Sequence, residues 1–241
     1  MAGTPGSGPA PNPDIYPLGL KNDELGVKLG GGIPKGSVVF IEGDEGSGRS
    51  VLSQRMLYGF LSNDRTATYI STEMTIRDFV DQMYSLNYRV DRHILTNKLS
   101  YFPVYPLLGA QAKSRDNFLQ KLMSSAVLYR NDILFVDSMS TLVKASLEEN
   151  GVLGLLGFLK KMSRQDKVVV MTAERGHKAL EPLRLAADVY LSLDMKNVAG
   201  GTARIINVKR FARARGEIGD TVRFRIEARV GMIIEITEVS G

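Results

Sequence analysis

The sequence predicts an α/β fold in which helices flank a mostly parallel central sheet and antiparallel strands form its C-terminal end. Three observations lead to this prediction. Up to residue 188, short apolar segments alternate with segments whose apolar residues have helical spacing. A glycine-rich turn joins the first predicted strand of this series to the first long helix. Beyond residue 188, strand-like segments follow one another with only turn residues between them.

The first part of the chain predicts alternating strands and helices. Ser37–Glu42 is rich in β-branched and aromatic residues, as expected of a buried strand. The other predicted strands are Thr66–Ser71, Leu99–Val104, Asp132–Val136 and Lys167–Thr172. Helices are predicted over Ser50–Leu61, Thr75–Leu86, Asn117–Tyr129 and Asn150–Met162. Because strands that alternate with helices are joined by right-handed crossovers, we expect a parallel sheet here.

The last part of the chain predicts consecutive strands. They span Val189–Leu193, Thr202–Lys209, Thr221–Glu227 and Met232–Thr237. Glycine-containing turns separate them, which is typical of antiparallel hairpins. We find no linker and expect one domain over residues 14–241. Residues 1–13 contain four prolines and no charged or aromatic residue, so we expect a disordered tail.

Composition excludes several classes of protein. The chain has no cysteine, which excludes disulfides, thiolate metal sites and cysteine nucleophiles. Its two histidines are too few for a histidine-rich metal cluster. The sequence contains neither a long apolar segment typical of a membrane span nor a signal-peptide pattern. These features fit a cytoplasmic protein.

The net positive charge is concentrated near the C-terminus. Residues 203–229 contain eight Lys or Arg and three Asp or Glu, which accounts for the whole formal charge of +5. Such a segment suits phosphate, nucleic acid or an acidic protein surface. The alternative is a solvated face of paired strands.

The most specific motif is a glycine-rich loop of the form G-x-x-x-x-G-[K/R]-[S/T] between a predicted strand and a predicted helix. Glycines allow backbone amides to turn around an anion, and the N-terminus of the following helix favours the same anion. The basic side chain reaches the terminal phosphates, and the hydroxyl of Ser50 is a magnesium ligand. The alternative is a turn that only caps a helix. The predicted nucleotide-binding residues are Asp44, Glu45, Gly46, Ser47, Gly48, Arg49, Ser50 and Val51.

The loop has Arg49 at the position where lysine is usual. Arginine keeps the positive charge but is larger and planar. We therefore expect nucleotide binding to be retained, whereas efficient hydrolysis does not follow from the motif.

Carboxylates follow two of the predicted strands. Asp137 ends the apolar segment Ile133–Val136, as in a Walker B strand, and is the second predicted magnesium ligand. Glu73 follows the strand Thr66–Ser71 and is the candidate catalytic base that polarises the attacking water. Helix capping is the alternative for both residues. Glu174, after the strand Lys167–Thr172, is a weaker candidate for sensing the γ-phosphate.

Two basic residues end a strand in the charged segment. In a ring, positive side chains of one subunit complete the site of its neighbour. Lys209 and Arg210 are the candidates for this role in trans. The alternative is edge-strand charges that protect against aggregation.

With these motifs, the chain resembles the KaiC-like branch of the RecA superfamily, and within that branch the FlaH (ArlH) family of the archaeal flagellum, or archaellum. The resemblance lies in the order and joint presence of several segments, which span most of the chain. These are Asn22–Ser37, Gly43–Gln54, Tyr69–Glu73, Phe102–Leu107, Asp137–Leu142 and Phe224–Ile236.

The resemblance implies a RecA-like P-loop domain that binds ATP and Mg²⁺ in the cytoplasm, at the membrane-proximal base of the archaellum. It also implies docking on the motor ATPase FlaI, a scaffold ring protein such as FlaX, and a hexameric ring. Members of this family are thought to act as nucleotide-dependent regulators or assembly factors with weak or no turnover. Arg49, and Met74 directly after Glu73, depart from the pattern of an efficient ATPase.

Two other functions stay open at this point. A RecA/RadA-type recombinase would use the basic segment to bind DNA, but the sequence shows no helical DNA-binding domain before the core, and we expect no nucleic-acid partner. Phe211–Ala214 mimics the F-x-x-A polymerisation tag of recombinases in a different part of the chain. The second of these alternatives is an active KaiC-like ATPase or autokinase.

Overall fold

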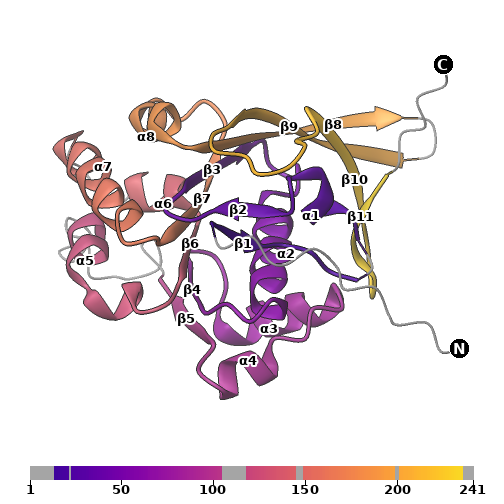
Figure 1. Cartoon of the computed structure of the whole chain (residues 1–241), viewed down its shortest axis with the longest axis horizontal. Helices are drawn as coiled ribbons and strands as arrows, with labels where there is room; N and C mark the ends of the chain where they lie inside the picture. Colours follow the sequence, from indigo (N-terminus) through magenta and orange to yellow (C-terminus); the bar gives the residue numbers. More distant parts are fainter. Residues whose placement is uncertain (1–13, 22, 105–117, 145–148, 199–200, 236–241) are drawn as a thin grey trace, which may run out of the picture.

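A single large sheet organises the structure. The computed structural model describes residues 14–21, 23–104, 118–144, 149–198 and 201–235, so the predicted tail at residues 1–13 lies outside the described residues. The sheet has nine strands in the order β11-β10-β9-β8-β3-β7-β6-β4-β5, and a two-stranded sheet, β1-β2, lies apart from it. Figure 1 shows helices on both sides of the large sheet.

The strands show both kinds of pairing that the sequence predicts. The parallel strands are β3 (Val38–Gly43), β4 (Ala67–Ser71), β5 (Leu99–Pro103), β6 (Ile133–Asp137), β7 (Val168–Glu174) and β8 (Val189–Val198). Antiparallel pairing then joins β8 to β9 (Gly201–Phe211), β10 (Thr221–Glu227) and β11 (Gly231–Ile234). The predicted α/β architecture is confirmed.

Each face of the sheet is covered by its own set of helices (Figure 1). The helices α2 (Arg49–Ser62), α3 (Ile76–Ser85) and α4 (Asp91–Leu95) lie on one face. The other face carries α5 (Phe118–Ser124), α6 (Met139–Lys144), α7 (Glu149–Ser163) and α8 (Glu181–Ala186). Successive side chains of a strand point to opposite faces, so Val39 and Ile41 of β3 join one hydrophobic cluster, and Val38 and Phe40 join the other.

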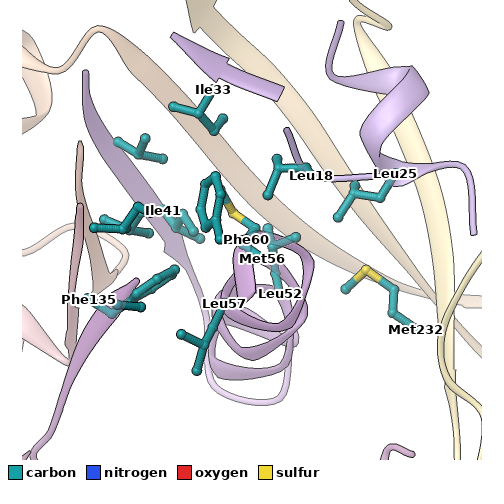
Figure 2. Packing of buried hydrophobic residues seen from close by; sticks show 14 of the residues in the cluster. Leu18, Leu25, Ile33, Ile41, Leu52, Met56, Leu57, Phe60, Phe135 and Met232 are labelled. Atoms are coloured by element: carbon teal, nitrogen blue, oxygen red, sulfur yellow. The ribbon is translucent and has the colours of Figure 1, made fainter. Parts of the chain in front are cut away.

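The helix α2 is held rigidly against the sheet. Its Leu52, Met56, Leu57 and Phe60 are fully buried, and Figure 2 shows them packed between the sheet and the N-terminal segment that carries Leu18. Burying each such side chain contributes about 1.5–3 kcal/mol. The first turn of α2 therefore has a fixed place at the carboxyl end of β3.

The structure differs from the predicted elements in several places. The described part of the predicted helix Asn117–Tyr129 is α5 followed by a 3₁₀ turn, Ala126–Tyr129, because Ser125 adopts an extended conformation with φ −83° and ψ 92°. The strand β8 continues to Val198, beyond the predicted Leu193. Several short elements were not predicted, namely β1 (Ile15–Pro17), α1 (Leu25–Lys28), β2 (Gly32–Pro34), α4, α6 and α8.

Candidate nucleotide-binding site

The glycine-rich loop occupies the place that its motif predicts, between β3 and α2. Gly46 and Gly48 have φ values of 76° and 92°, a left-handed conformation that glycine adopts without strain. Gly48 is also the N-cap of α2, and it has no side chain that could cap the helix. The first amides of α2 are thus left for another acceptor, and an anion at this position would interact favourably with the helix dipole.

Two buried polar atoms of the loop have no partner among the described residues. They are Oγ of Ser47 and Nη1 of Arg49. Leaving a buried donor unsatisfied costs about 1–3 kcal/mol, and more for a charged group. A polyphosphate would supply acceptors to both atoms at once. The residues present therefore fit a bound nucleotide, and Arg49 occupies the position of the usual lysine.

Ser50 and Asp137 come together next to the loop. The Ser50 hydroxyl on α2 donates a hydrogen bond to Oδ1 of Asp137 at the end of β6, with 3.2 Å between the oxygens. Asp137 is buried and also accepts hydrogen bonds from Thr172 Oγ1 at 2.6 Å and from the Tyr69 hydroxyl at 2.7 Å. Burial, and then the charge of Asp137, raise the pKa of Tyr69 well above its usual value, so this hydroxyl remains a donor.

These contacts show which groups surround the carboxylate of Asp137. Its carboxylate accepts hydrogen bonds from the side-chain hydroxyls of three elements, α2, β4 and β7, and among the described contacts none comes from an amide of α6. The N-cap alternative is therefore not what the structure shows. Hydroxyl and carboxylate oxygens are ligands that Mg²⁺ prefers, so Ser50 and Asp137 fit a magnesium ion that neutralises phosphate charge.

Glu73 lies in the loop between β4 and α3, with its side chain exposed. Thr75, not Glu73, is the N-cap of α3, and it forms a capping box with Asp78. Partial desolvation and, secondarily, the nearby Asp137 raise the pKa of Glu73, while Arg49 lowers it. Glu73 therefore shares the electrostatic environment of the loop and of Asp137, as a base acting on water near a γ-phosphate would.

Glu174 is the last residue of β7, directly beside Gly43 in the parallel register. Its backbone amide donates to Ser140 Oγ at 2.7 Å. The position is at the site, as the sequence predicts, and the Glu174 charge contributes to the raised pKa of Glu73.

Lys209 and Arg210 lie away from the loop of the same chain. Arg210 pairs with Tyr190, which is beside Phe40, whereas the loop begins after Gly43. The guanidinium of Arg210 donates to the backbone oxygens of Leu185 and Ala187 at 2.8 and 2.7 Å, at the C-terminal end of α8. Arg210 thus has a structural contact in its own chain, and a role in trans remains a proposal.

Residues that sequence analysis missed also touch the loop. Arg175, directly after β7, has its Nε 3.4 Å from Asp44 Oδ2 and donates to Asp194 of β8 at 2.5 Å. Arg204 of β9 donates from Nε to the Gly46 oxygen at 3.0 Å. The position of Arg175 after a parallel strand is a sequence signal that could have found it. No motif marks Arg204, because its place depends on strand register.

The chain is similar to known proteins over most of its length. A family model described as "ATPase: KaiC" matches residues 22–238. The archaeal flagellar ATP-binding protein FlaH of Methanocaldococcus jannaschii is 35% identical over 230 residues, which cover 94% of this chain and 98% of that protein. This chain belongs to the FlaH family of KaiC-like ATPases.

Solved structures agree with the family. The crystal structure of the M. jannaschii flagellar accessory protein FlaH aligns with a TM-score of 0.87 and 34% identity, covering 92% of this chain and 100% of that one. A KaiC-like protein, PH0186 from Pyrococcus horikoshii OT3, has a TM-score of 0.74 at 17% identity over 92% of this chain and 100% of that one, and shares the fold. The predicted RecA-like, KaiC-like fold is confirmed. Within the described part of this FlaH chain, no helix has the length and apolar character needed to cross a membrane.

Proposed function

We propose that this FlaH chain binds ATP with Mg²⁺ through the loop Asp44–Val51, Ser50 and Asp137. The observation that carries the proposal is the buried Nη1 of Arg49, which lacks a partner among the described residues and lies in a loop whose glycines and helix N-terminus favour an anion. Bound magnesium would neutralise phosphate charge between Ser50 and Asp137. The relatives named ATP-binding protein support the same ligand.

We also propose that the protein works in the archaellum, in the cytoplasm at the membrane-proximal base. Relatives that cover nearly the whole chain are named archaeal flagellar proteins. In this proposal the chain forms a hexameric ring, docks on the motor ATPase FlaI and lies within a scaffold ring of FlaX or an equivalent protein. Lys209 and Arg210 reach the site of the neighbouring subunit, and Arg210 leaves its contacts at α8 when the ring assembles.

The nucleotide acts as a switch in this proposal, with slow or no turnover. A ligand shifts a conformational equilibrium by its differential affinity for the two states, and hydrolysis is not needed for that shift. Arg49 in place of lysine and Met74 directly after Glu73 both argue against an efficient ATPase. ATP therefore controls when the FlaI-docking surface forms.

The test measures ATP binding and FlaI binding in the same preparation. Thermal unfolding and calorimetry are recorded with ATP, ADP or no nucleotide in magnesium, and binding of purified FlaI is then titrated under each condition. A ligand at 100 times its Kd stabilises the folded state by about 2.7 kcal/mol, so ATP will raise the melting temperature. FlaI will bind more tightly with ATP than without nucleotide.

The variant Arg49→Ala separates the two parts of this test. It loses the buried cation of the loop, and both the thermal shift and the ATP dependence of FlaI binding will decrease. ATP affinity of Arg49→Ala equal to that of the wild type would remove the loop from the site. Equal FlaI affinity in all nucleotide states of the wild type would reject the switch.

A second candidate function is slow ATP hydrolysis or autophosphorylation, because Glu73 follows β4 and its pKa is raised by desolvation and by the charge of Asp137. Phosphate release that depends on Glu73 would support hydrolysis, and phosphate incorporated into the protein would support the kinase. A DNA-binding recombinase gains no support from membership of the FlaH family.

A further inference from the structure

A row of three side chains crosses the antiparallel strands behind the glycine-rich loop. Met195 of β8 is paired with Arg204 of β9, and Arg204 is paired with Phe224 of β10. A Cβ atom added to Gly46 would lie 3.8 Å from Met195 Sδ. One added to Gly48 would lie 3.2 Å from the Phe224 ring and 3.3 Å from Arg204 Cδ. Both loop glycines therefore lie directly against this row.

Arg204 is the polar member of the row and makes one hydrogen bond with the loop. Its Nε donates to the Gly46 oxygen at 3.0 Å, and its side chain has no other hydrogen bond or ion pair with the described residues. Two other arginines of residues 203–229 have partners elsewhere, since Arg225 pairs with Glu227 and Arg210 donates to carbonyl groups at the end of α8. Among the described residues, the Gly46 oxygen is therefore the one hydrogen-bonding partner of the Arg204 side chain.

The contact has a consequence for a bound anion. A carbonyl oxygen that faced the polyphosphate would repel it, and the peptide plane that carries the Gly46 oxygen also carries the Ser47 amide. Holding the oxygen on the Arg204 side therefore fixes the orientation of the Gly46–Ser47 peptide. Gly46 has no Cβ, so its own backbone selects the orientation of this peptide only weakly. Two hydrogen bonds hold the peptide at its two ends, one from Arg204 Nε to the Gly46 oxygen and one from the Ser47 amide to the Asp44 oxygen at 3.2 Å.

A second contact ties the other side of the loop to the same pair of strands. Asp44 lies near Arg175, and Arg175 donates to Asp194 of β8. Asp194 in turn accepts a hydrogen bond from Asn207 of β9 at 2.8 Å. The first half of the loop is thus held on two sides by β8 and β9.

We propose that Arg204 is a positioning residue of the nucleotide site, which holds the Gly46 carbonyl away from the phosphates and makes the β8–β9 hairpin respond to nucleotide binding. The proposal rests on the proposed function, because it requires that the loop binds ATP. It deepens that function because it names β8 and β9 as the strands whose dynamics change when the loop binds a nucleotide.

Two substitutions with side chains of the same length separate the effect of the hydrogen-bond donor at Nε from the effect of the positive charge. In Arg204→Gln, the amide nitrogen stands at the same number of bonds from Cβ as Nε of arginine, so the donor remains and the charge is lost. In Arg204→Met, a methyl group replaces that donor. Arg223→Met is the matched control. Arg223 is an exposed residue of β10, and because it precedes Phe224 in the strand, its side chain points to the face of the sheet opposite to the Phe224 ring.

The experiment measures the ATP affinity of each full-length variant in magnesium, and amide hydrogen exchange over residues 193–206 with and without saturating ATP. We expect ATP binding about tenfold weaker in Arg204→Met, as for the loss of one hydrogen bond, and near-wild-type binding in Arg204→Gln and Arg223→Met. ATP will slow exchange over residues 193–206 in the wild type and in Arg204→Gln, but not in Arg204→Met. If Arg204 had only a structural role, Arg204→Met would change amide exchange over residues 193–206 by the same amount with and without ATP.

The outcomes separate the inference from the proposed function. A wild-type protein that fails to bind ATP rejects the proposed function, and the inference with it. A wild type that binds ATP, together with Arg204→Met equal to Arg223→Met in affinity and protection, rejects the inference alone. Arg204→Gln as weak as Arg204→Met would also overturn it, since the donor would then have no role. If Arg204→Met does not fold, the wild type still decides the question, because amide exchange over residues 193–206 that is the same with and without ATP would overturn the inference.

Discussion

Ser50 and Asp137 lie 87 residues apart in the sequence, yet the Ser50 hydroxyl donates a hydrogen bond to the Asp137 carboxylate across 3.2 Å. Ser50 belongs to the first turn of α2, and Asp137 ends β6, which is separated from β3 by β7 in the sheet. The carboxyl ends of parallel strands meet at one edge, where ligands bind in open α/β sheets. Because the two predicted magnesium ligands lie within hydrogen-bonding distance, the magnesium dependence of ATP binding is the first property to test.

Replacing Asp137 with asparagine will weaken ATP binding in magnesium by about tenfold, because the anionic oxygen is lost while the side-chain volume is kept. Calorimetry with magnesium and with excess EDTA measures this effect. Without magnesium, the variant and the wild type should bind ATP with similar affinity. An equal magnesium dependence in both proteins would show that Asp137 does not contribute to a metal site.

Replacing Arg49 with lysine will retain ATP binding within a few-fold and will increase phosphate release. Both residues carry the positive charge, but lysine is a compact point charge on a flexible stem, whereas the guanidinium is planar. Calorimetry measures the affinity, and a phosphate-release assay at saturating ATP measures turnover. If lysine leaves turnover at the wild-type rate, Arg49 is not what limits hydrolysis.

The pH dependence of any hydrolysis will report on Glu73. A general base acts when it is deprotonated, and the pKa of Glu73 is raised above the ordinary value of 4.5 by desolvation and by Asp137. Turnover will therefore decrease with falling pH, beginning at a higher pH than for an ordinary carboxylate. Phosphate release is measured across the mildly acidic range under conditions that keep the site saturated.

The variant Glu73→Gln identifies the source of that profile. It should abolish hydrolysis and leave ATP affinity unchanged. Glu217→Gln is the control, because Glu217 is an exposed residue of the turn before β10. A Glu73→Gln protein that keeps the wild-type rate and pH profile would assign the base to another residue.

Stability will depend strongly on a buried ion pair away from the site. Arg55 of α2 is fully buried, pairs with Asp23 and donates to the Leu18 oxygen at 3.1 and 3.2 Å. Replacing Arg55 with methionine leaves Asp23 without its cation, and breaking a buried pair costs about 3–5 kcal/mol. Urea denaturation followed by circular dichroism measures this loss in the free energy of unfolding.

The matched control is Lys98→Met, which breaks the exposed pair of Lys98 with Asp64. Exposed pairs contribute little because water and salt screen them. Equal urea midpoints for Arg55→Met and the wild type would show that the N-terminal segment is not anchored by this pair.

The elements near the motif were predictable because their causes are local. β-branched residues at Val38–Ile41 favour a strand, and Gly43–Gly48 can adopt the left-handed conformations that the loop needs. The role of Ser125 in ending α5 was not predictable in the same way. Its neighbours have good helical spacing, and only the extended conformation of Ser125 stops the helix.

The functions of the arginines show where local reasoning stops. Arg210 was predicted as a candidate for the neighbouring site, but in its own chain it binds the carbonyl groups at the end of α8. Arg204 was counted only as part of a charged segment, yet it contacts the loop. The same residue type in the same segment has two different partners, because strand register and the bulge between Tyr190 and Leu191 decide which side of the sheet each side chain occupies.

The amino-acid sequence by itself determined the alternation of strands and helices, the conformation of the loop Gly43–Gly48 and the identity of the basic and hydroxyl groups that the loop offers. Tertiary structure alone decided that Asp137, Thr172 and Tyr69 meet Ser50, and that Met195, Arg204 and Phe224 form a row behind the loop. The physical reason is that backbone preferences act over a few residues. Strand order and register are instead set by the burial of two hydrophobic clusters, to which residues throughout the chain contribute together.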